Sequence, residues 1–207
     1  MSARGLCAQS RSGGERDCAK KAAAPRGRDG RARRRYGPGV PRIDVPADQE
    51  PLLHLWTTKA TALTGAAGAL SDAVYRRSTL PLREFEAART RIAQINDCQL
   101  CLDWRTARDV PDRAAPGEDV PAELYENVGS NPSWEGFTER ERLAAEFAER
   151  YALDHRGMDD ELWARLHAAF TDDELVDLAV CVGSWLAFGR LNRVFDVDGA
   201  CRIPLHP

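Results

Sequence analysis

Two cysteines three positions apart, Cys98 and Cys101, are the residues of this sequence best suited to chemistry. A pair at this spacing can close a local disulfide and reopen it, and so pass two electrons without refolding the chain. Glu86 lies twelve residues before Cys98, and Arg105 lies four residues after Cys101. A carboxylate can take up or release a proton, and a guanidinium adds a fixed positive charge that favours thiolate over thiol. Together these four residues predict redox chemistry at the cysteine pair.

The cysteine pair is expected at the start of a helix, because the two polar residues before Cys98 interrupt an apolar pattern with side chains suited to capping. A helix from Cys98 to about Arg108 would place Cys98, Cys101 and Arg105 on one face. The unpaired N–H groups and the dipole at its N-terminus would lower the pKa of the Cys98 thiol. The sequence therefore predicts two thiols and a guanidinium on a shared side.

Two structural interpretations compete with this one. Glu86 could pair with Arg89, or with another nearby arginine, on the surface. A single Cys-x-x-Cys also occurs in zinc sites, which need four ligands. No second paired motif is present, so we expect no metal, and no cofactor apart from the Cys98–Cys101 disulfide. The other possible ligands in the sequence are Cys181, Cys201, His54, His155 and His167.

The sequence from residue 48 onward predicts one helix after another, with no alternating run long enough for a strand. The expected fold class is therefore all-α, with about six to eight helices. Residues 49–77 are expected to form two helices broken near Thr64-Gly65. Pro81 then opens a helix with one apolar stripe, formed by Phe85, Ala88, Ile92 and Ile95.

The second half is marked by clearer boundaries. Residues 110–132 carry four prolines and two glycines, so we expect a long connection around one short turn at 122–126. Thr138 and Thr171 each begin a capping-box sequence and predict two helix starts. A third helix at 159–170 should turn Leu162, Trp163, Leu166 and Phe170 inward.

The last helix, expected from Thr171 to about Phe195, is apolar nearly all round between Leu175 and Phe188. Such a helix is buried by its own domain or by a neighbouring subunit. A homo-oligomer is therefore expected. Cys181 lies within this apolar run and is interpreted as a small buried core residue.

Charge divides the chain into an arm and a folded domain. Residues 1–43 hold 12 Arg or Lys against 3 Asp or Glu, a net +9, and the rest of the chain holds 17 against 29, a net −12. We expect a disordered Arg- and Gly-rich extension over 1–44, one domain over 45–200 and a tail over 201–207. Nucleic-acid binding by the arm is disfavoured, because Tyr36 is its one aromatic residue. A start codon assigned too far upstream, with a natural start at Val40, is the favoured interpretation.

The expected location is the cytoplasm. Arg33-Arg34-Arg35 is followed by Tyr36-Gly37-Pro38-Gly39, whereas a secretory signal needs an apolar core at this point. The most apolar stretch, from Leu175 to Leu191, is interrupted by Asp177 and Arg190, so no membrane span is expected. In a reducing compartment a vicinal cysteine pair is typically catalytic or metal-binding. We assign no role to Cys7, Cys18 or Cys201.

The central motif resembles that of the alkylhydroperoxidase-like (AhpD-like) branch of the carboxymuconolactone decarboxylase family. The resemblance extends over residues 45–197. Its residues are Glu86, Ile92-Ala93-Gln94-Ile95-Asn96, Cys98-Gln99-Leu100-Cys101, the stretch from Phe170 to Leu178, and Gly189-Arg190-Leu191-Asn192-Arg193.

The resemblance implies an AhpD-like all-α fold, subunits that associate through their helices, and a thiol-dependent peroxidase of antioxidant type. By this resemblance Cys101 attacks the peroxide and becomes a sulfenic acid, and Cys98 resolves it to a disulfide. Glu86 matches the glutamate of a proton relay. An external dithiol or a reductase protein restores the thiols.

The sequence departs from that pattern at Arg105, where the family has a histidine. Arginine can stabilise a thiolate or bind an anion, but it cannot pass a proton. Either Glu86 and water handle protons alone, or His54 enters the site, or the pocket takes a different, anionic substrate. One alternative function is a non-redox lyase acting on a carboxylated lactone, with Arg105 or Arg193 binding the carboxylate. Another is a non-catalytic helical oligomer that senses redox state through its disulfide.

Overall fold

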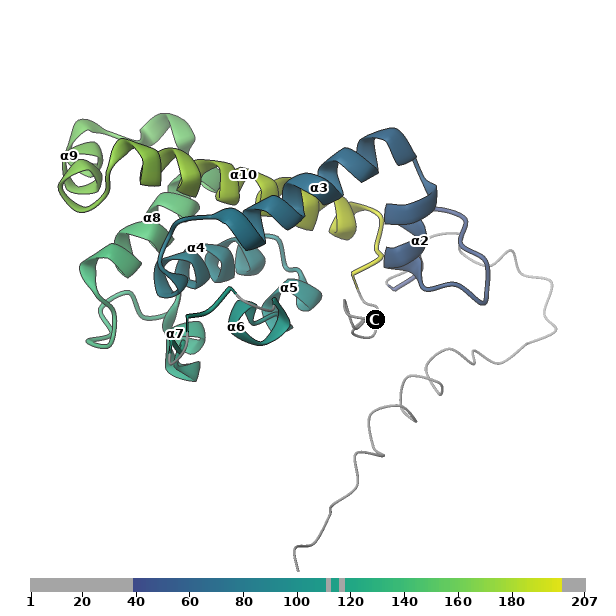
Figure 1. The fold of residues 1–207 in the computed structure, drawn as a ribbon, viewed down its shortest axis with the longest axis horizontal. Helices are drawn as coiled ribbons and strands as arrows, with labels where there is room; N and C mark the ends of the chain where they lie inside the picture. Colours follow the sequence, from purple (N-terminus) through teal and green to yellow (C-terminus); the bar gives the residue numbers. More distant parts are fainter. Residues whose placement is uncertain (1–38, 111–112, 116–117, 199–207) are drawn as a thin grey trace, which may run out of the picture. The chain divides into compact units, whose positions relative to one another are not determined.

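The computed structural model describes residues 39–110, 113–115 and 118–198. These residues form nine α-helices and one short 3-10 helix, and no strand occurs among them, which confirms the all-α prediction. The count is higher than expected because the chain after Cys98 forms two short helices instead of one, and because the short turn expected at 122–126 is a helix. In chain order (Figure 1) the elements are α2 (Pro51–Thr58), α3 (Thr61–Arg77), α4 (Leu82–Ile95), α5 (Gln99–Asp103), α6 (Thr106–Asp109), α7 (Ala122–Asn127), α8 (Glu139–Leu153), η1 (His155–Gly157), α9 (Asp160–Ala169) and α10 (Asp172–Val194).

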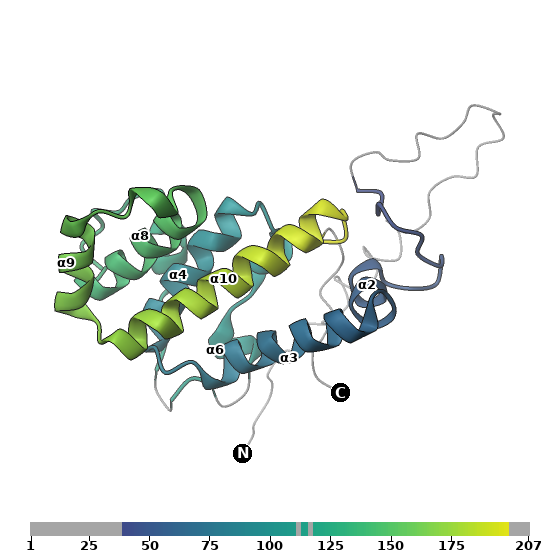
Figure 2. The ribbon, with the colours of Figure 1, turned by 90° about the horizontal axis from the view of Figure 1, so that it is seen from above.

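Helix α4 is the central element, since it contacts α8 and α10 and also the short helices α5, α6 and α7. Helix α10 lies against α4 and α8 (Figure 2). The predicted stripe faces the main core, where Phe85, Ala88 and Ile92 are fully buried. The opposite side of α4 buries Leu82 and Ala87 in a second cluster with residues of α7. A helix covered on both sides must also bury its polar residues, and these require partners.

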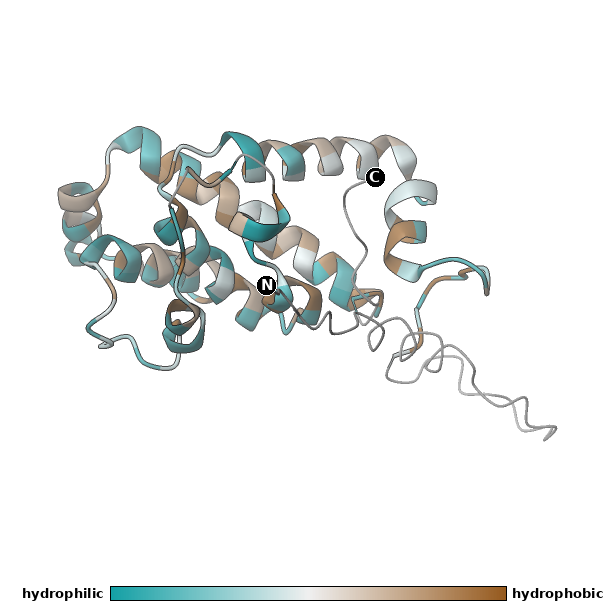
Figure 3. Ribbon diagram, turned by 60° about the horizontal axis from the view of Figure 1, so that its bottom comes forward, coloured by the Kyte–Doolittle hydropathy of each residue, from teal (hydrophilic) through white to brown (hydrophobic). Residues whose placement is uncertain are grey.

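Helices α8 and α10 begin where the sequence predicts. Thr138 and Thr171 each cap a helix, and both capping boxes are complete, with Glu141 and Glu174 bonding back to the caps. Asp159 caps α9 through its side chain. In the hydropathy view (Figure 3), most helices carry both hydrophilic and hydrophobic residues along their length.

Two details of the predicted helices are wrong. The break in the first segment lies at Lys59 and Ala60, not near Thr64-Gly65, because Ala60 takes a left-handed conformation (φ 46°) and ends the preceding helix. Gly65 continues within α3, where a side chain would meet open space. Trp163 is 36% exposed instead of facing the core, although Leu162 and Leu166 of the same helix are buried.

Residues 39–44 of the expected arm are described, and the Arg42 N–H donates to the carbonyl of Phe195 at 2.9 Å. The rest of the predicted arm, and the predicted tail at 201–207, lie outside the described residues, together with Cys7, Cys18 and Cys201. No helix in the described part of the chain has the length and apolar character needed to cross a membrane.

Candidate active site

The two motif cysteines form a disulfide, with their Cα atoms 5.2 Å apart. The helix begins next to Cys98, as expected, but Cys98 itself is the N-cap of α5 instead of Asn96 or Asp97, and its sulfur accepts the Cys101 N–H at 3.3 Å. The two positions differ in environment, because Cys98 is fully buried and Cys101 is only partly buried. The sulfur atoms are therefore not equivalent towards a small molecule.

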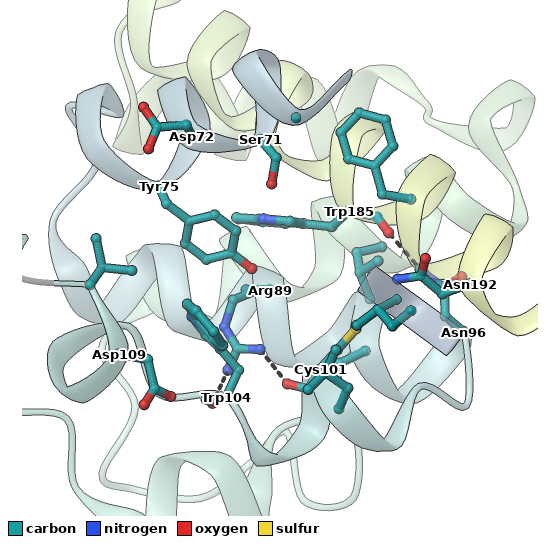
Figure 4. A pocket seen from close by; sticks show the side chains of 18 of the residues that line it. Ser71, Asp72, Tyr75, Arg89, Asn96, Cys101, Trp104, Asp109, Trp185 and Asn192 are labelled. Atoms are coloured by element: carbon teal, nitrogen blue, oxygen red, sulfur yellow. Dashed lines mark hydrogen bonds between the residues drawn. The ribbon is translucent and has the colours of Figure 1, made fainter. Parts of the chain in front are cut away.

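Cys101 lines a cavity of about 450 Å³ that is built from α2, α3, α4, α5, α6 and α10 (Figure 4). Cys98 is not among the lining residues. The wall is mainly apolar and includes several aromatic side chains, and its polar groups include Arg89 and Asn96 of the segment before the disulfide. The aromatic lining residues are Trp56, Tyr75, Trp104, Trp185 and Phe188.

Glu86 pairs with Arg89 within the protein interior. The Arg89 Nε and Nη2 atoms donate to the two Glu86 carboxylate oxygens at 2.7 and 3.0 Å. The exposed fractions of the two side chains are 0% and 2%, so the expectation of a surface pair is wrong. One turn of helix separates the residues, which lets a single face of α4 carry both charges. The sequence indicates the pair, but not its burial.

Arg89 also connects this ion pair to the cysteine segment. Its Nη1 donates to the carbonyl of Cys101 at 2.6 Å, and its Nη2 donates to the carbonyl of Trp104 at 2.9 Å (Figure 4). These carbonyls lie at the C-terminal end of the short helix α5, where they have no partner within the helix. Arg89 therefore fixes the backbone that carries Cys101, a contribution that sequence reasoning missed.

Glu86 is held as a carboxylate. Burial raises its pKa, but the charge of Arg89 and hydrogen bonds from Arg89, Thr106 and Tyr125 outweigh burial and bring the pKa below its ordinary value. Thr106 begins α6 and its hydroxyl donates to Glu86 Oε1. Glu86 does not line the cavity. Its charge reaches the cysteine segment through Arg89.

Arg105 lies outside the cavity lining, and the expected shared helix face is wrong. Helix α5 ends at Asp103, and Arg105 is an extended residue (φ −135°) that begins the next helix. Its guanidinium donates to the carbonyls of Leu102 and Trp104 and stacks 3.8 Å from the centre of the Tyr125 ring. The side chain thereby completes the helix end, while Arg89 is the arginine that faces the cavity beside Cys101.

The other candidate residues are engaged elsewhere. His54 does not line the cavity, and its ring nitrogens contact Gln49 and Thr58. Arg193 pairs with Asp97 at 3.1 Å. Cys181 is buried, as predicted, and burial raises the pKa of its thiol. Within the described residues, no group of three or more His, Cys, Asp or Glu side chains is arranged to hold a metal ion.

Comparison with known proteins places this geometry in a context. No protein-family model matches the sequence. Over 116 residues the chain is 33% identical to the uncharacterised protein YnjA of Escherichia coli K12; the match covers 55% of this chain and 60% of YnjA. The chain thus spans somewhat more than half the length of this relative.

A solved structure from Agrobacterium tumefaciens superposes with a TM-score of 0.57 at 20% identity, over 68% of this chain and 92% of the other. That protein, ATU0492, is described as being of unknown function and is provisionally assigned as the antioxidant defence protein AhpD. A likeness at this identity concerns the fold. The chain therefore has the all-α fold of AhpD-like proteins, as the motif around Cys98 and Cys101 led us to expect.

Proposed function

We propose that the protein is a thiol-dependent peroxidase, in which Cys101 is the nucleophile, Cys98 the resolving cysteine, and an external dithiol or reductase protein the electron donor. The observation that carries this proposal is the position of the disulfide. Cys101 lies on a cavity large enough for a small organic molecule, and Cys98 is bonded to it from the buried side. A substrate in the cavity would meet Cys101 first.

The proposed reaction has three steps that balance. The Cys101 thiolate attacks one oxygen of a hydroperoxide, so that an S–O bond forms, the O–O bond breaks and an alcohol leaves after taking one proton. Cys98 then attacks the sulfenic sulfur, forms the disulfide and releases water. An external dithiol returns two electrons and two protons. This cycle needs no metal or organic cofactor.

The cavity favours an organic hydroperoxide over hydrogen peroxide. Its aromatic wall would bury an apolar body, and each buried CH₂ group contributes about 0.8 kcal/mol. Asn96, whose buried Oδ1 has no hydrogen-bond partner among the described residues, adds a polar residue to the lining of the same cavity.

The geometry supports a positioning role for Glu86. The carboxylate holds Arg89, and Arg89 holds the carbonyl of Cys101. Removing Glu86 would therefore displace the nucleophile even if Glu86 passes no proton. Its predicted proton-handling role, and the predicted stabilisation of the thiolate by Arg105, stay predictions.

The test is hydroperoxide consumption with dithiothreitol as the dithiol. We expect Cys101→Ser to abolish turnover and Cys181→Ala, a buried cysteine outside the cavity, to retain it. Turnover that is indifferent to Cys101 would contradict the proposal. A disulfide that forms once with stoichiometric hydroperoxide, and is never reduced by dithiols, would indicate the redox-sensing alternative instead.

The lyase alternative has no geometric support, since neither Arg105 nor Arg193 lines the cavity. Decarboxylation of a lactone that survives in a Cys98→Ser/Cys101→Ser variant would favour the lyase. We propose that the enzyme works in a reducing compartment such as the cytoplasm, where dithiol donors keep the cycle running.

A further inference from the structure

We propose that Tyr75 is the acid that protonates the departing alkoxide when Cys101 attacks an organic hydroperoxide. This inference rests on the proposed peroxidase function. The proposed reaction needs a residue that passes a proton to the leaving group. Arg105, which stands where the resembled family has a histidine, cannot release its proton and does not line the cavity. The assignment comes from the groups that the cavity wall presents.

Few groups on this wall can give up a proton to a substrate. Asp72 is bonded to Arg76, and Asp109 accepts the backbone N–H of Arg105, so both act as acceptors. Arg89 is held in its charged form, because the coulombic interaction and hydrogen bonds with Glu86 raise its pKa against the effect of burial. Tyr75 carries an O–H on the same wall, and a phenol is a far stronger acid than an alcohol such as that of Ser71.

Aromatic contacts fix the Tyr75 ring. It is contributed by α3 and packs against Phe85, Trp104 and Trp185, with ring centroids 5.7, 5.6 and 6.4 Å apart. Figure 4 shows its hydroxyl pointing into the cavity, towards Arg89 and on the side where Cys101 lies. Trp104 immediately follows the helix that carries Cys101, so the phenol and the sulfur share one aromatic wall.

The surroundings suit a proton donor. Burial raises the pKa of Tyr75 to about 12, with the charge of Arg89 opposing the rise and that of Glu86 adding to it. The hydroxyl therefore keeps its proton at neutral pH, and it remains more acidic than the alcohol formed from an alkoxide. The phenolate left after transfer would face the Arg89 guanidinium. That positive charge would stabilise it until a solvent proton returns.

The step is balanced as follows. The sulfur of Cys101 bonds to the terminal oxygen of the hydroperoxide, the O–O bond breaks, and the remaining alkoxide takes the Tyr75 proton to leave as an alcohol. Sulfur is oxidised and the peroxide is reduced by two electrons. Tyr75 then recovers its proton from water.

A leaving-group comparison tests this assignment. Reduced protein is mixed with cumene hydroperoxide, whose leaving group is a strongly basic alkoxide, or with perbenzoic acid, whose benzoate leaves without a proton. The rate of sulfenic acid and disulfide formation is followed in a single turnover without dithiol. We expect Tyr75→Phe to slow the reaction with cumene hydroperoxide about a hundredfold and to leave the reaction with perbenzoic acid close to wild type.

The matched control is Tyr151→Phe, the same change on α8 outside the cavity, which should alter neither rate. An equal effect of Tyr75→Phe on both oxidants, or no effect on either, would overturn the assignment and leave the peroxidase proposal standing. If wild-type protein reacts with neither oxidant at Cys101, the peroxidase proposal itself fails.

Discussion

Arg89 binds two parts of the site at once. One is the carboxylate of Glu86, and the other is the pair of backbone carbonyls, of Cys101 and Trp104, at the end of α5. Four of its five N–H groups are engaged by Glu86, Cys101 and Trp104. A buried ion pair gives little net stability, but removing one partner leaves the other charge buried and unpaired. The pair therefore acts as a constraint on the position of Cys101.

Substitution of Arg89 should be far more costly than substitution of its neighbour on the same helix. Arg89→Met leaves the Glu86 carboxylate buried without its partner and should lower the free energy of unfolding by about 3–5 kcal/mol. Arg91 pairs with the half-exposed Glu149, so Arg91→Met should cost about 1 kcal/mol or less. Urea unfolding measures both, and equal costs would contradict the account.

The same pair predicts an acid-sensitive stability. Because the folded pKa of Glu86 lies below its unfolded value, the group stabilises the fold above the unfolded pKa of about 4.3, and this contribution is lost as the pH falls towards the folded pKa. Between about pH 5 and pH 3 the wild type should lose more unfolding free energy than Glu86→Gln/Arg89→Gln. Glu174, whose pKa is also lowered, titrates equally in both proteins. Parallel pH curves would contradict this prediction.

At the residue scale, the sequence predicts the cysteine pair but not its surroundings. The spacing of Cys98 and Cys101 is local, so their disulfide at the start of a helix follows from it, although Cys98 caps this helix in place of Asn96 or Asp97. The inward position of Glu86 and Arg89 does not, because it depends on helices α5, α6 and α7 covering the second side of α4. A single apolar stripe on α4 indicates only one buried face.

At the element scale, helix starts were predicted better than helix breaks. Thr138 and Thr171 carry their capping partner three residues ahead, so the signal is complete within one turn. The break at Trp104 and Arg105 has no such local signal. It is stabilised by the tertiary contact of Arg89 with the Cys101 and Trp104 carbonyls, and locally by Arg105, which binds the carbonyls of Leu102 and Trp104.

Close packing of α4 against α10 depends on Gly189. A Cβ at this position would collide with the Asn96 side chain, whose Nδ2 donates to the carbonyl of Trp185 at 3.0 Å. Gly189→Ala should therefore destabilise the protein by about 1–3 kcal/mol and slow the reaction of Cys101.

Gly65→Ala is the matched control, because a Cβ there meets open space within α3. It should stabilise the protein by about 0.5–1 kcal/mol, through the better helix propensity of alanine. Thermal unfolding compares the two variants. If Gly189→Ala proved as harmless as Gly65→Ala, the inferred contact with Asn96 would be wrong.

At the scale of the whole molecule, the cavity could not be predicted, since its wall comes from six helices whose mutual packing does not follow from any one segment of the sequence. A second feature at this scale is a pair of exposed apolar residues on α10. Val176 and Val180, one turn apart, are 63% and 48% exposed, although the helix is otherwise rich in buried residues. These two valines are the part of the predicted apolar helix that the described chain leaves exposed.

We expect this face of α10 to pack against a second copy of the chain. Light scattering should then give a mass well above the 22.9 kDa of one chain. Val176→Lys/Val180→Lys should reduce that mass, whereas Leu63→Lys, at a 75% exposed position on α3, should not. A wild-type protein that remains a single chain at all concentrations would contradict this expectation.

The central claim is that Cys101, not Cys98, receives the oxidising equivalent, because Cys101 alone of the pair lines the cavity. The most direct measurement uses the two single variants with one equivalent of cumene hydroperoxide, followed by dimedone trapping and peptide mass spectrometry. We predict a dimedone adduct on Cys101 in Cys98→Ser and none on Cys98 in Cys101→Ser. Labelling of Cys98 in the second variant, or of neither cysteine in either variant, would contradict the account.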